Sequence, residues 1–395
     1  MTGTSILIVG GGVAGAATAW SLGRLGAQNV TLLEREPILG TQSSGLNAAI
    51  LRTVSGSPAL TQISERGAAF LAAPPKDFSP VPLVHECGLL LTADAGASDE
   101  LLRNFEAASS SSSGERLSHG QVTSLFPQLD LEFEVALWFP REGRIDIAAL
   151  MAGFERGARQ AGVAIEAGVK VDSLLVENQT VVGVRLSDGS ERRASTTVLA
   201  AGGWAGALGQ SAGSDVFLEP RRRHLMVTTP STDIDANAPV LWHHGQTPFY
   251  TRPESGGVLF CACDEFVVDP DHCRTDPAVR DLLAERASEH LPGIAGAGMS
   301  SFWAGMRTFT HDGQFAIGPD PKLRGLFWVA GLGGHGMVCS APAGELAARA
   351  LFRIDDQDPL RSAFAPKAAK NGKPPLSALK KAHSERPPRE EQVPL

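Results

Sequence analysis

The chain has 395 residues, of which 43% are hydrophobic and 20% are charged, and its formal net charge at pH 7 is −8. This length is too great for one simple core and predicts two intertwined domains. The acidic balance disfavours nucleic-acid binding, which needs a basic face. Five cysteines without a C-x-x-C pair disfavour a disulfide framework.

The N-terminal segment 6–34 predicts a βαβ unit that binds a dinucleotide. An apolar run enters a turn with Gly10, Gly12 and Gly15, an alanine-rich helical pattern follows, and a second apolar run ends in Glu34. In such a turn the first glycine permits tight bending, the second lets the backbone approach a pyrophosphate, and the third lets the helix pack closely on the sheet. Glu34 stands at about the spacing of 20 residues expected for an acid that holds a ribose. The alternative is a glycine turn that serves packing alone.

The centre of the chain predicts loops and short strands. Residues 40–56 are small, polar and rich in glycine, which favours a loop that approaches a ligand. The serine run at 109–114 predicts an exposed loop. Residues 163–201 predict short strands joined by turns at 177–178 and 188–189.

The C-terminal half predicts an antiparallel sheet and a second glycine-rich turn. Apolar and polar runs alternate between 217 and 267, and a helix is expected over 276–292. An apolar strand at 325–329 then leads through the glycine turn 331–336 into a helix expected over 342–352.

Four metal-ligating residue types stand close together between these elements. Cys261, Cys263, His272 and Cys273 match no standard zinc spacing, so we expect no metal there. Cys261 and Cys263 are predicted to be buried on one face of a strand.

The N-terminal residues do not predict a signal peptide, and the C-terminal tail predicts disorder. Residues 1–5 lack the basic part of a signal peptide, and no segment approaches the roughly 18 apolar residues of a membrane span, so a cytoplasmic protein is expected. Beyond Phe364 the tail has no aromatic residue and many Pro, Lys and Glu, which predicts disorder.

Five ordered motifs between residues 5 and 355 carry a resemblance to a known family. They are ILIVGGGVAG with LLERE, SSGLNAAI, FPREGRIDIAAL, VLAAGGWAGAL, and WAGMRTFTHDGQFAIGP followed by LFWVAGLGGHGM. They resemble those of the D-amino-acid oxidase and dehydrogenase superfamily of flavoproteins, which includes glycine oxidase and sarcosine oxidase. Within it, WAGMRTF, GLFWVA and the GGHG turn look most like the bacterial D-arginine dehydrogenases.

The resemblance implies an α/β fold in which a Rossmann-like FAD-binding domain is interleaved with an α+β substrate domain built on an antiparallel sheet. The FAD-binding domain would comprise residues 1–85, 145–215 and 310–364. The substrate domain would comprise residues 86–144 and 216–309, followed by a disordered tail at 365–395.

The resemblance also implies non-covalent FAD in place of NAD. Glu34 would hold the adenosine ribose with Arg35 beside it, and Val171 would border the adenine. Gly305 stands where sarcosine oxidases carry the cysteine that binds flavin covalently. The remaining residues expected to contact FAD are Gly10, Gly12, Ala14, Gly15, Ser43, Ser44, Gly45, Leu46, Asn47, Ala48, Gly333, Gly334, His335, Gly336 and Met337.

Three residues are expected to bind the substrate carboxylate or to shield the flavin. Arg307, in WAGMRTF, falls on the family's carboxylate-binding arginine, a role that suits a planar guanidinium. Arg223 falls on a second substrate arginine, with a solvated basic strand as the alternative. Tyr250, the one tyrosine of the chain, falls on a substrate-contacting tyrosine.

Other positions bear on proton transfer and specificity. His335 is expected to accept a substrate proton or to stabilise reduced flavin, with a structural role as the alternative. Arg52 stands where sarcosine oxidases place a carboxylate arginine. Leu89 replaces a glutamate of the D-arginine group, and Ile50 and Ser55 replace a histidine and a tyrosine, so the pocket is expected to prefer neutral side chains.

Together these features predict an FAD-dependent oxidative deamination of a neutral D-amino acid. Hydride would pass from Cα to flavin N5, and the imino acid would hydrolyse to a 2-oxo acid and ammonia. The alternatives are oxidation of an N-methyl amino acid or a 2-hydroxy acid, a flavin-carrying subunit of an electron-transfer complex, and an NAD-dependent dehydrogenase. The electron acceptor is oxygen or a quinone or other carrier. The family's oxygen-reactive lysine has no counterpart within 256–264, which favours a carrier.

Overall fold

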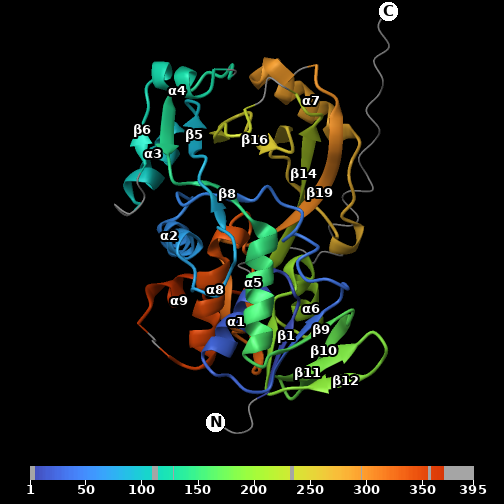
Figure 1. Ribbon diagram of the computed structural model, residues 1–395. Helices are drawn as coiled ribbons and strands as arrows, with labels where there is room; N and C mark the ends of the chain where they lie inside the picture. The colour runs from blue at the N-terminus through green and yellow to red at the C-terminus, as the bar shows by residue number, and fades with distance from the viewer. Residues whose placement is uncertain are drawn as a thin grey trace, which may run out of the picture.

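The computed structural model describes residues 5–108, 114–127, 129–231, 235–294, 296–354 and 357–368. The predicted loop at 109–113 and the predicted tail from 369 onward lie outside these residues. Figure 1 shows two lobes, with the N-terminal strand and the helices α1, α5 and α8 in the lower lobe and a large sheet in the upper lobe.

The lower lobe is built on a six-stranded sheet whose neighbouring strands are parallel, except that β20 runs antiparallel to β21. In spatial order its strands are β20 (Ala316–Pro319), β21 (Leu326–Ala330), β13 (Thr196–Leu199), β1 (Ile6–Val9), β2 (Val30–Glu34) and β9 (Ala164–Ala167). Because the chain leaves β1 toward β2 and later returns to β13 on its other side, β1 lies at the switch point where open α/β sheets bind ligands.

Helices and a small sheet cover the two faces of this sheet. The helices α1 (Val13–Arg24), α5 (Ile147–Gln160) and α8 (Gly336–Leu351) share one apolar core with alternate residues of β1. The opposite residues of β1 share a second apolar core with β10 (Val171–Glu177) and β11 (Thr180–Leu186), and β12 (Glu191–Arg193) pairs with β11 as the third strand of this antiparallel sheet. The turns joining these strands lie at 178–179 and 188–189, which confirms the predicted hairpins.

The upper lobe contains a nine-stranded sheet that is antiparallel except for the pair β5–β15. Along the sheet its strands are β18 (Phe266–Val267), β14 (Leu218–Thr228), β17 (Gly257–Cys261), β16 (Phe249–Glu254), β15 (Val240–His244), β5 (Leu89–Ala93), β7 (Val135–Phe139) and β6 (Glu115–Arg116), with β19 (Met299–Thr310) also paired to β14. The helices of this lobe are α3 (Ser98–Glu106), α4 (His119–Leu125) and α7 (Ala278–His290). In Figure 1, β14 and β19 extend from this sheet toward the lower lobe.

Short elements join the lobes. The strands β3 (Ile50–Leu51), β8 (Gly143–Ile145) and β4 (Val84–His85) form a small antiparallel sheet. The remaining helices are α2 (Pro58–Ala72), α6 (Ala205–Ser211) and α9 (Pro359–Ala363), with 3₁₀ turns at Gly202–Trp204, Pro270–His272 and Pro292–Ile294. The predicted fold class is therefore confirmed. In the described part of the chain, no helix is long and apolar enough to cross a membrane.

The helix expected over 342–352 begins earlier, at Gly336, so that the glycine turn runs directly into α8. Pro342, where the expected helix begins, lies inside α8. Its missing N–H frees the carbonyl of Val338, four residues earlier. A Cβ on Gly67 of α2 would lie 1.8 Å from that carbonyl oxygen. The proline is thus accommodated where α2 packs closely on α8.

Two local expectations are also wrong. The strand β17 ends at Cys261, and Cys263 lies beyond it with a left-handed backbone, so the two cysteines do not alternate along one strand. The predicted disorder does not begin at residue 365. Lys367 forms a salt bridge of 2.6 Å with Asp312, and Ala368 pairs with Val216.

Candidate active site

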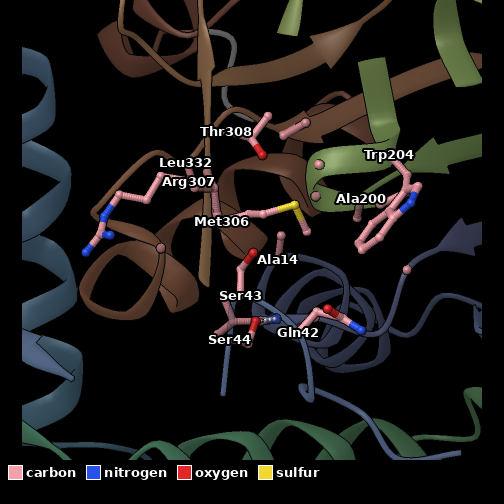
Figure 2. Close-up of a pocket in the computed structure, with 18 of the residues that line it drawn as sticks. Ala14, Gln42, Ser43, Ser44, Ala200, Trp204, Met306, Arg307, Thr308 and Leu332 are labelled. Atoms are coloured by element: carbon pink, nitrogen blue, oxygen red, sulfur yellow. Dashed lines mark hydrogen bonds between the residues drawn. The ribbon is translucent and has the colours of Figure 1, made fainter. Parts of the chain in front are cut away.

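One cavity of about 460 Å³ connects the carboxyl edge of the six-stranded sheet with the upper sheet. Figure 2 shows Ala14, Ser43 and Ser44 on one side of it and Met306 and Thr308 on the other. The same cavity is lined by Glu34 at one end and by Tyr250 at the other. Residues predicted to bind FAD and residues predicted to bind the substrate therefore line the same cavity.

The first glycine turn has the geometry that its spacing predicts. Gly10 has a φ of +106°, and a Cβ there would lie 2.5 Å from the carbonyl oxygen of Ala200. A Cβ on Gly15 would lie 1.9 Å from the carbonyl oxygen of Gly10, so α1 could not approach the turn with a larger residue. Gly12 lines the cavity, and a Cβ there would approach only Ser44 Oγ, at 3.2 Å. Its backbone is therefore open to a ligand.

The loop after β2 closes over the start of α1. The Val13 N–H donates to Ser44 Oγ at 2.9 Å, which caps the helix from a residue distant in sequence. Within the loop, Asn47 Nδ2 donates to the carbonyl of Ser44 at 2.8 Å, and Asn47 Oδ1 accepts from the Ala49 N–H at 2.7 Å. These bonds fix the segment 43–48, and its members Ser43, Ser44, Leu46, Asn47 and Ala48 line the cavity. Gly45 does not line it, because Gly45 packs on the carbonyl of Gly40.

Glu34 ends β2 with a buried carboxylate that faces the cavity. Its Oε2 accepts from the Gly11 N–H at 2.5 Å, and its Oε1 accepts from the Glu36 N–H at 2.8 Å. Each carboxylate oxygen can accept a further hydrogen bond. The side chain is thus held in place and still able to bind hydroxyl groups.

Three residues close this end of the cavity, and only Arg35 was predicted. The Arg35 guanidinium lies 3.9 Å from the ring centre of Trp204. Trp204 Nε1 donates to Asp271 Oδ1 at 2.8 Å, and Arg35 Nη1 lies 3.6 Å from the same oxygen. Asp271 belongs to the 3₁₀ turn after β18, so the upper lobe contributes to this end. Val171 and Lys170 line it too.

At the other end, Arg307 lines the cavity and donates from Nη2 to the Tyr250 hydroxyl at 3.0 Å. Tyr250 is fully buried, and burial raises the pKa of its hydroxyl, so the phenol is neutral. The second glycine turn packs against this pair, because a Cβ on Gly334 would lie 3.3 Å from Arg307 Nε. Gly333 to Met337, the residues expected to contact FAD, all line the cavity.

His335 lies between Arg52 and Ser55. Its Nε2 is 3.0 Å from Arg52 Nη2 and 2.6 Å from Ser55 Oγ. Because a guanidinium can only donate, Nε2 must be the acceptor, which places the ring proton on Nδ1. Burial, Arg52 and Arg307 lower the pKa of His335 to about 3. The imidazole is therefore neutral and a weak base, which disfavours the expected role as proton acceptor.

Arg52 lines the cavity with its guanidinium 4.1 Å from the ring centre of Trp242. Burial lowers the pKa of Arg52 to about 10. The nearby Glu142 accepts from the N–H of Thr53 at 3.1 Å and from its hydroxyl. Glu142 Oε2 has no hydrogen-bond partner among the described residues, and burial raises the pKa of this carboxyl to about 7.

Three predicted substrate residues do not line the cavity, namely Arg223, Leu89 and Ser55. Arg223 is buried beside it, but its guanidinium forms a salt bridge with Glu265 and donates to the carbonyl of Asp264. Leu89 is fully buried in an apolar cluster with Val54, and its substrate role was wrong because β5 directs it into the core. The expected preference for neutral side chains therefore loses part of its basis. Among the described residues, no three His, Cys, Asp or Glu side chains gather to hold a metal ion.

The whole arrangement matches one protein family. The chain matches the DAO family model, described as FAD dependent oxidoreductase, over residues 5–350. The protein belongs to the DAO family. It is an FAD-dependent oxidoreductase, as the resemblance implied.

Individual relatives of this DAO-family protein are distant. It is 27% identical over 354 residues to 4-methylaminobutanoate oxidase (formaldehyde-forming) of Paenarthrobacter nicotinovorans, a match that covers 86% of this chain but only 42% of that protein. It is 25% identical over 362 residues to glycine oxidase of Geobacillus kaustophilus, covering 88% of this chain and 93% of that protein. The structure of L-proline dehydrogenase from P. horikoshii has a TM-score of 0.81 at 21% identity, covering 92% of this chain and 96% of that one, which shows the shared fold.

The cavity of the flavoprotein fits FAD. The glycine turn brings the start of α1, which Ser44 caps, to the cavity, where it can bind a pyrophosphate. The Glu34 carboxylate at the end of β2 can accept hydrogen bonds from a ribose. The geometry at Gly305 disfavours the covalent attachment that a cysteine would make at this position. A Cβ at that position would lie 2.3 Å from the carbonyl oxygen of Leu46, so no cysteine fits there.

Proposed function

We propose that the protein oxidises a carbon–nitrogen bond of an amino acid whose carboxylate is bound by Arg307 and Tyr250. One observation carries this proposal. Arg307 lines the cavity and forms no salt bridge with any described residue, and its partner is the neutral Tyr250 hydroxyl. A guanidinium in this setting favours an incoming anion, because burial of an unpaired charge is costly.

Arg307 and Tyr250 bind the carboxylate, and His335 positions neighbouring side chains. Arg307 can present two N–H groups to a carboxylate. Since Arg307 is the donor to Tyr250, the phenol keeps its own proton and can donate it to the same carboxylate. The neutral His335 holds Arg52 and Ser55 in place. Bound FAD would supply the hydride acceptor. The oxidised product, an imine, then takes up water and releases ammonia and a 2-oxo acid.

Our first candidate substrate is a primary α-amino acid of the D series, as the family resemblance implies. The relative named glycine oxidase supports a primary amine. A second candidate is an N-methyl amino acid, which the relative named 4-methylaminobutanoate oxidase favours. In that case oxidation at the N-methyl carbon gives an iminium ion, whose hydrolysis releases formaldehyde and the demethylated amino acid.

The test is anaerobic reduction of the purified holoenzyme by D- and L-amino acids, their N-methyl derivatives and 2-hydroxy acids. Flavin bleaching, followed at about 450 nm, identifies the substrate class. Re-oxidation in air, compared with a quinone, then identifies the acceptor. If the 2-hydroxy acids alone bleach the flavin, the proposal is wrong.

Arg307→Met tests the carboxylate site directly. Loss of two charge-assisted hydrogen bonds predicts about 100-fold weaker substrate binding in the reduction titration. The matched control is Arg221→Met. Arg221 is the cross-strand neighbour of Arg307 but forms salt bridges with Glu219 and Glu265 and does not line the cavity. Equal effects of the two substitutions would contradict the assignment.

A further inference from the structure

A loop of the upper lobe reaches the end of the cavity at which Glu34 can bind the ribose of FAD. This loop, residues 264–276, lies between β17 and α7 and includes β18. Asp271, near its middle, accepts from Trp204 Nε1 at 2.8 Å and lies 3.6 Å from Arg35 Nη1. Asp271, Trp204 and Arg35 all line the cavity. The loop therefore covers the adenosine end of the FAD site.

Both ends of this loop are bonded to one histidine, His224 of β14. The His224 N–H donates to Asp264 Oδ1 at 2.9 Å, and His224 Nδ1 lies 2.7 Å from Asp264 Oδ2. On the other side of the ring, Nε2 accepts from the Asp276 N–H at 2.9 Å. Because Nε2 is an acceptor, the ring proton is on Nδ1 and is donated to Asp264. Each ring nitrogen thus binds a different end of the loop.

His224 is held rigidly in this position. Its side chain is fully buried, and the Asp264 carboxylate is buried with it. The imidazole stacks on the ring of Phe302, with ring centres 5.3 Å apart. The two polar groups of the ring and both oxygens of the carboxylate are therefore satisfied by this one arrangement.

The neighbouring Arg222 binds the far end of the same loop. Its Nη1 donates to the Arg274 carbonyl and its Nη2 donates to Asp276 Oδ2, each at 3.0 Å. Fixing both ends of a loop reduces the conformational entropy that its middle residues must lose to stay in one place. Bonds at the base of the loop thus stabilise the position of Asp271.

We propose that His224 and Arg222 are positioning residues for FAD. They fix the base of the loop 264–276, the loop holds Asp271 in place, and Asp271 orients Trp204 and Arg35 at the adenosine end of the cavity. Neither His224 nor Arg222 lines the cavity, so both act through Asp271. The inference concerns retention of FAD and is independent of the substrate proposed above.

His224→Asn tests the bond to the far end of the loop. The Asn amide can still donate to Asp264 from about the position of Nδ1, but it is too short to accept from the Asp276 N–H. We expect FAD to dissociate from this variant holoenzyme roughly threefold faster than from the wild type, because one hydrogen bond at the base of the loop is lost. The fluorescence of free FAD measures the rate. An unchanged rate would overturn the inference.

A double-mutant cycle with Asp271→Ala separates positioning from a general loss of stability. If His224 acts through Asp271, His224→Asn adds nothing to the rate of FAD release in the Asp271→Ala background. If it speeds release equally in both backgrounds, His224 stabilises the fold as a whole and the inference is wrong. The matched control is His243→Asn, at another buried histidine of the upper sheet, whose Nδ1 lies 3.0 Å from Thr92 Oγ1. Its release rate should equal that of the wild type.

Arg222→Met keeps the inference testable if His224→Asn does not fold. The Arg222 side chain is 17% exposed and its partner Asp276 is 40% exposed, so the substitution leaves no buried carboxylate without a partner. We expect faster FAD release from Arg222→Met alone and no further increase when it is combined with Asp271→Ala. Equal acceleration in the two backgrounds, or none in either, would overturn the inference.

Discussion

Replacing Glu142 with Gln should make the protein more stable at alkaline pH. The folded state raises the pKa of this buried carboxyl from 4.5 to about 7. Below pH 4.5 the group is protonated in both states and contributes no difference. As the pH rises from 4.5 to 7 the unfolded state releases the proton first, so stability is lost, and above pH 7 the loss is constant at about 3 kcal/mol. The Gln side chain cannot ionise and avoids this loss.

The pH dependence of the difference is the decisive quantity. Gln can accept the same bonds from Thr53, but its amide N–H₂ takes the place of Oε2, which has no partner among the described residues. That cost is the same at every pH. Between pH 5 and pH 8, the Glu142→Gln variant should therefore gain about 2.5 kcal/mol relative to the wild type.

Thermal unfolding with saturating FAD measures this gain. With an unfolding entropy of about 2 cal/mol/K per residue, the gain corresponds to a relative rise in Tm of roughly 3 °C between the two pH values. Glu132→Gln, at an exposed position, is the control and should show no such trend. If the stability of Glu142→Gln relative to the wild type instead falls between pH 5 and pH 8, Glu142 is an ionised partner of Arg52 and the reasoning fails.

Three further substitutions test other parts of the cavity. Gly15→Ala places a Cβ 1.9 Å from the carbonyl oxygen of the first turn glycine, so we expect a protein purified without flavin, and a stable yellow variant would contradict the turn geometry. Tyr250→Phe removes the hydroxyl that accepts from Arg307. Binding of the substrate carboxylate, measured by flavin reduction, should weaken about tenfold. Unchanged affinity would exclude the phenol from the site. Asp271→Ala removes the hydrogen-bond acceptor of Trp204. The rate of FAD release, measured by the fluorescence of free FAD, should rise roughly fivefold. An unchanged release rate would show that this contact does not retain the cofactor.

Local sequence signals predicted the parts of the fold that depend on neighbouring residues. The turn of Gly10 and Gly15 was predictable because its steric demands are set within a few residues. The hairpins around Asn178 and Gly189 were predictable for the same reason, since each turn needs a positive φ. Family resemblance, and not periodicity, supplied the order of the two interleaved domains.

Contacts between distant segments were not predictable in this way. Asp271 reaches Trp204 and Arg35 from another lobe, and no local pattern marks it as a cavity residue. Leu89 was assigned to the pocket by alignment with a glutamate, although its strand turns it into the core. The low basicity of His335 depends on two arginines that only the folded chain brings near the ring.

Three arginines on one face of β14 and β19, namely Arg221, Arg223 and Arg307, show why sequence alone could not choose among them. Arg221 stands opposite Arg307 in the sheet, and Arg223 is two residues further along β14, so all three side chains lie on one face. Their residue type and their strand position are alike. What separates them is the placement of acids, because Glu219 and Glu265 neutralise Arg221 and Arg223. Among these three, only Arg307 keeps its charge available to a ligand, and that difference arises from the loop after β17 that carries Glu265, not from the arginine motif itself.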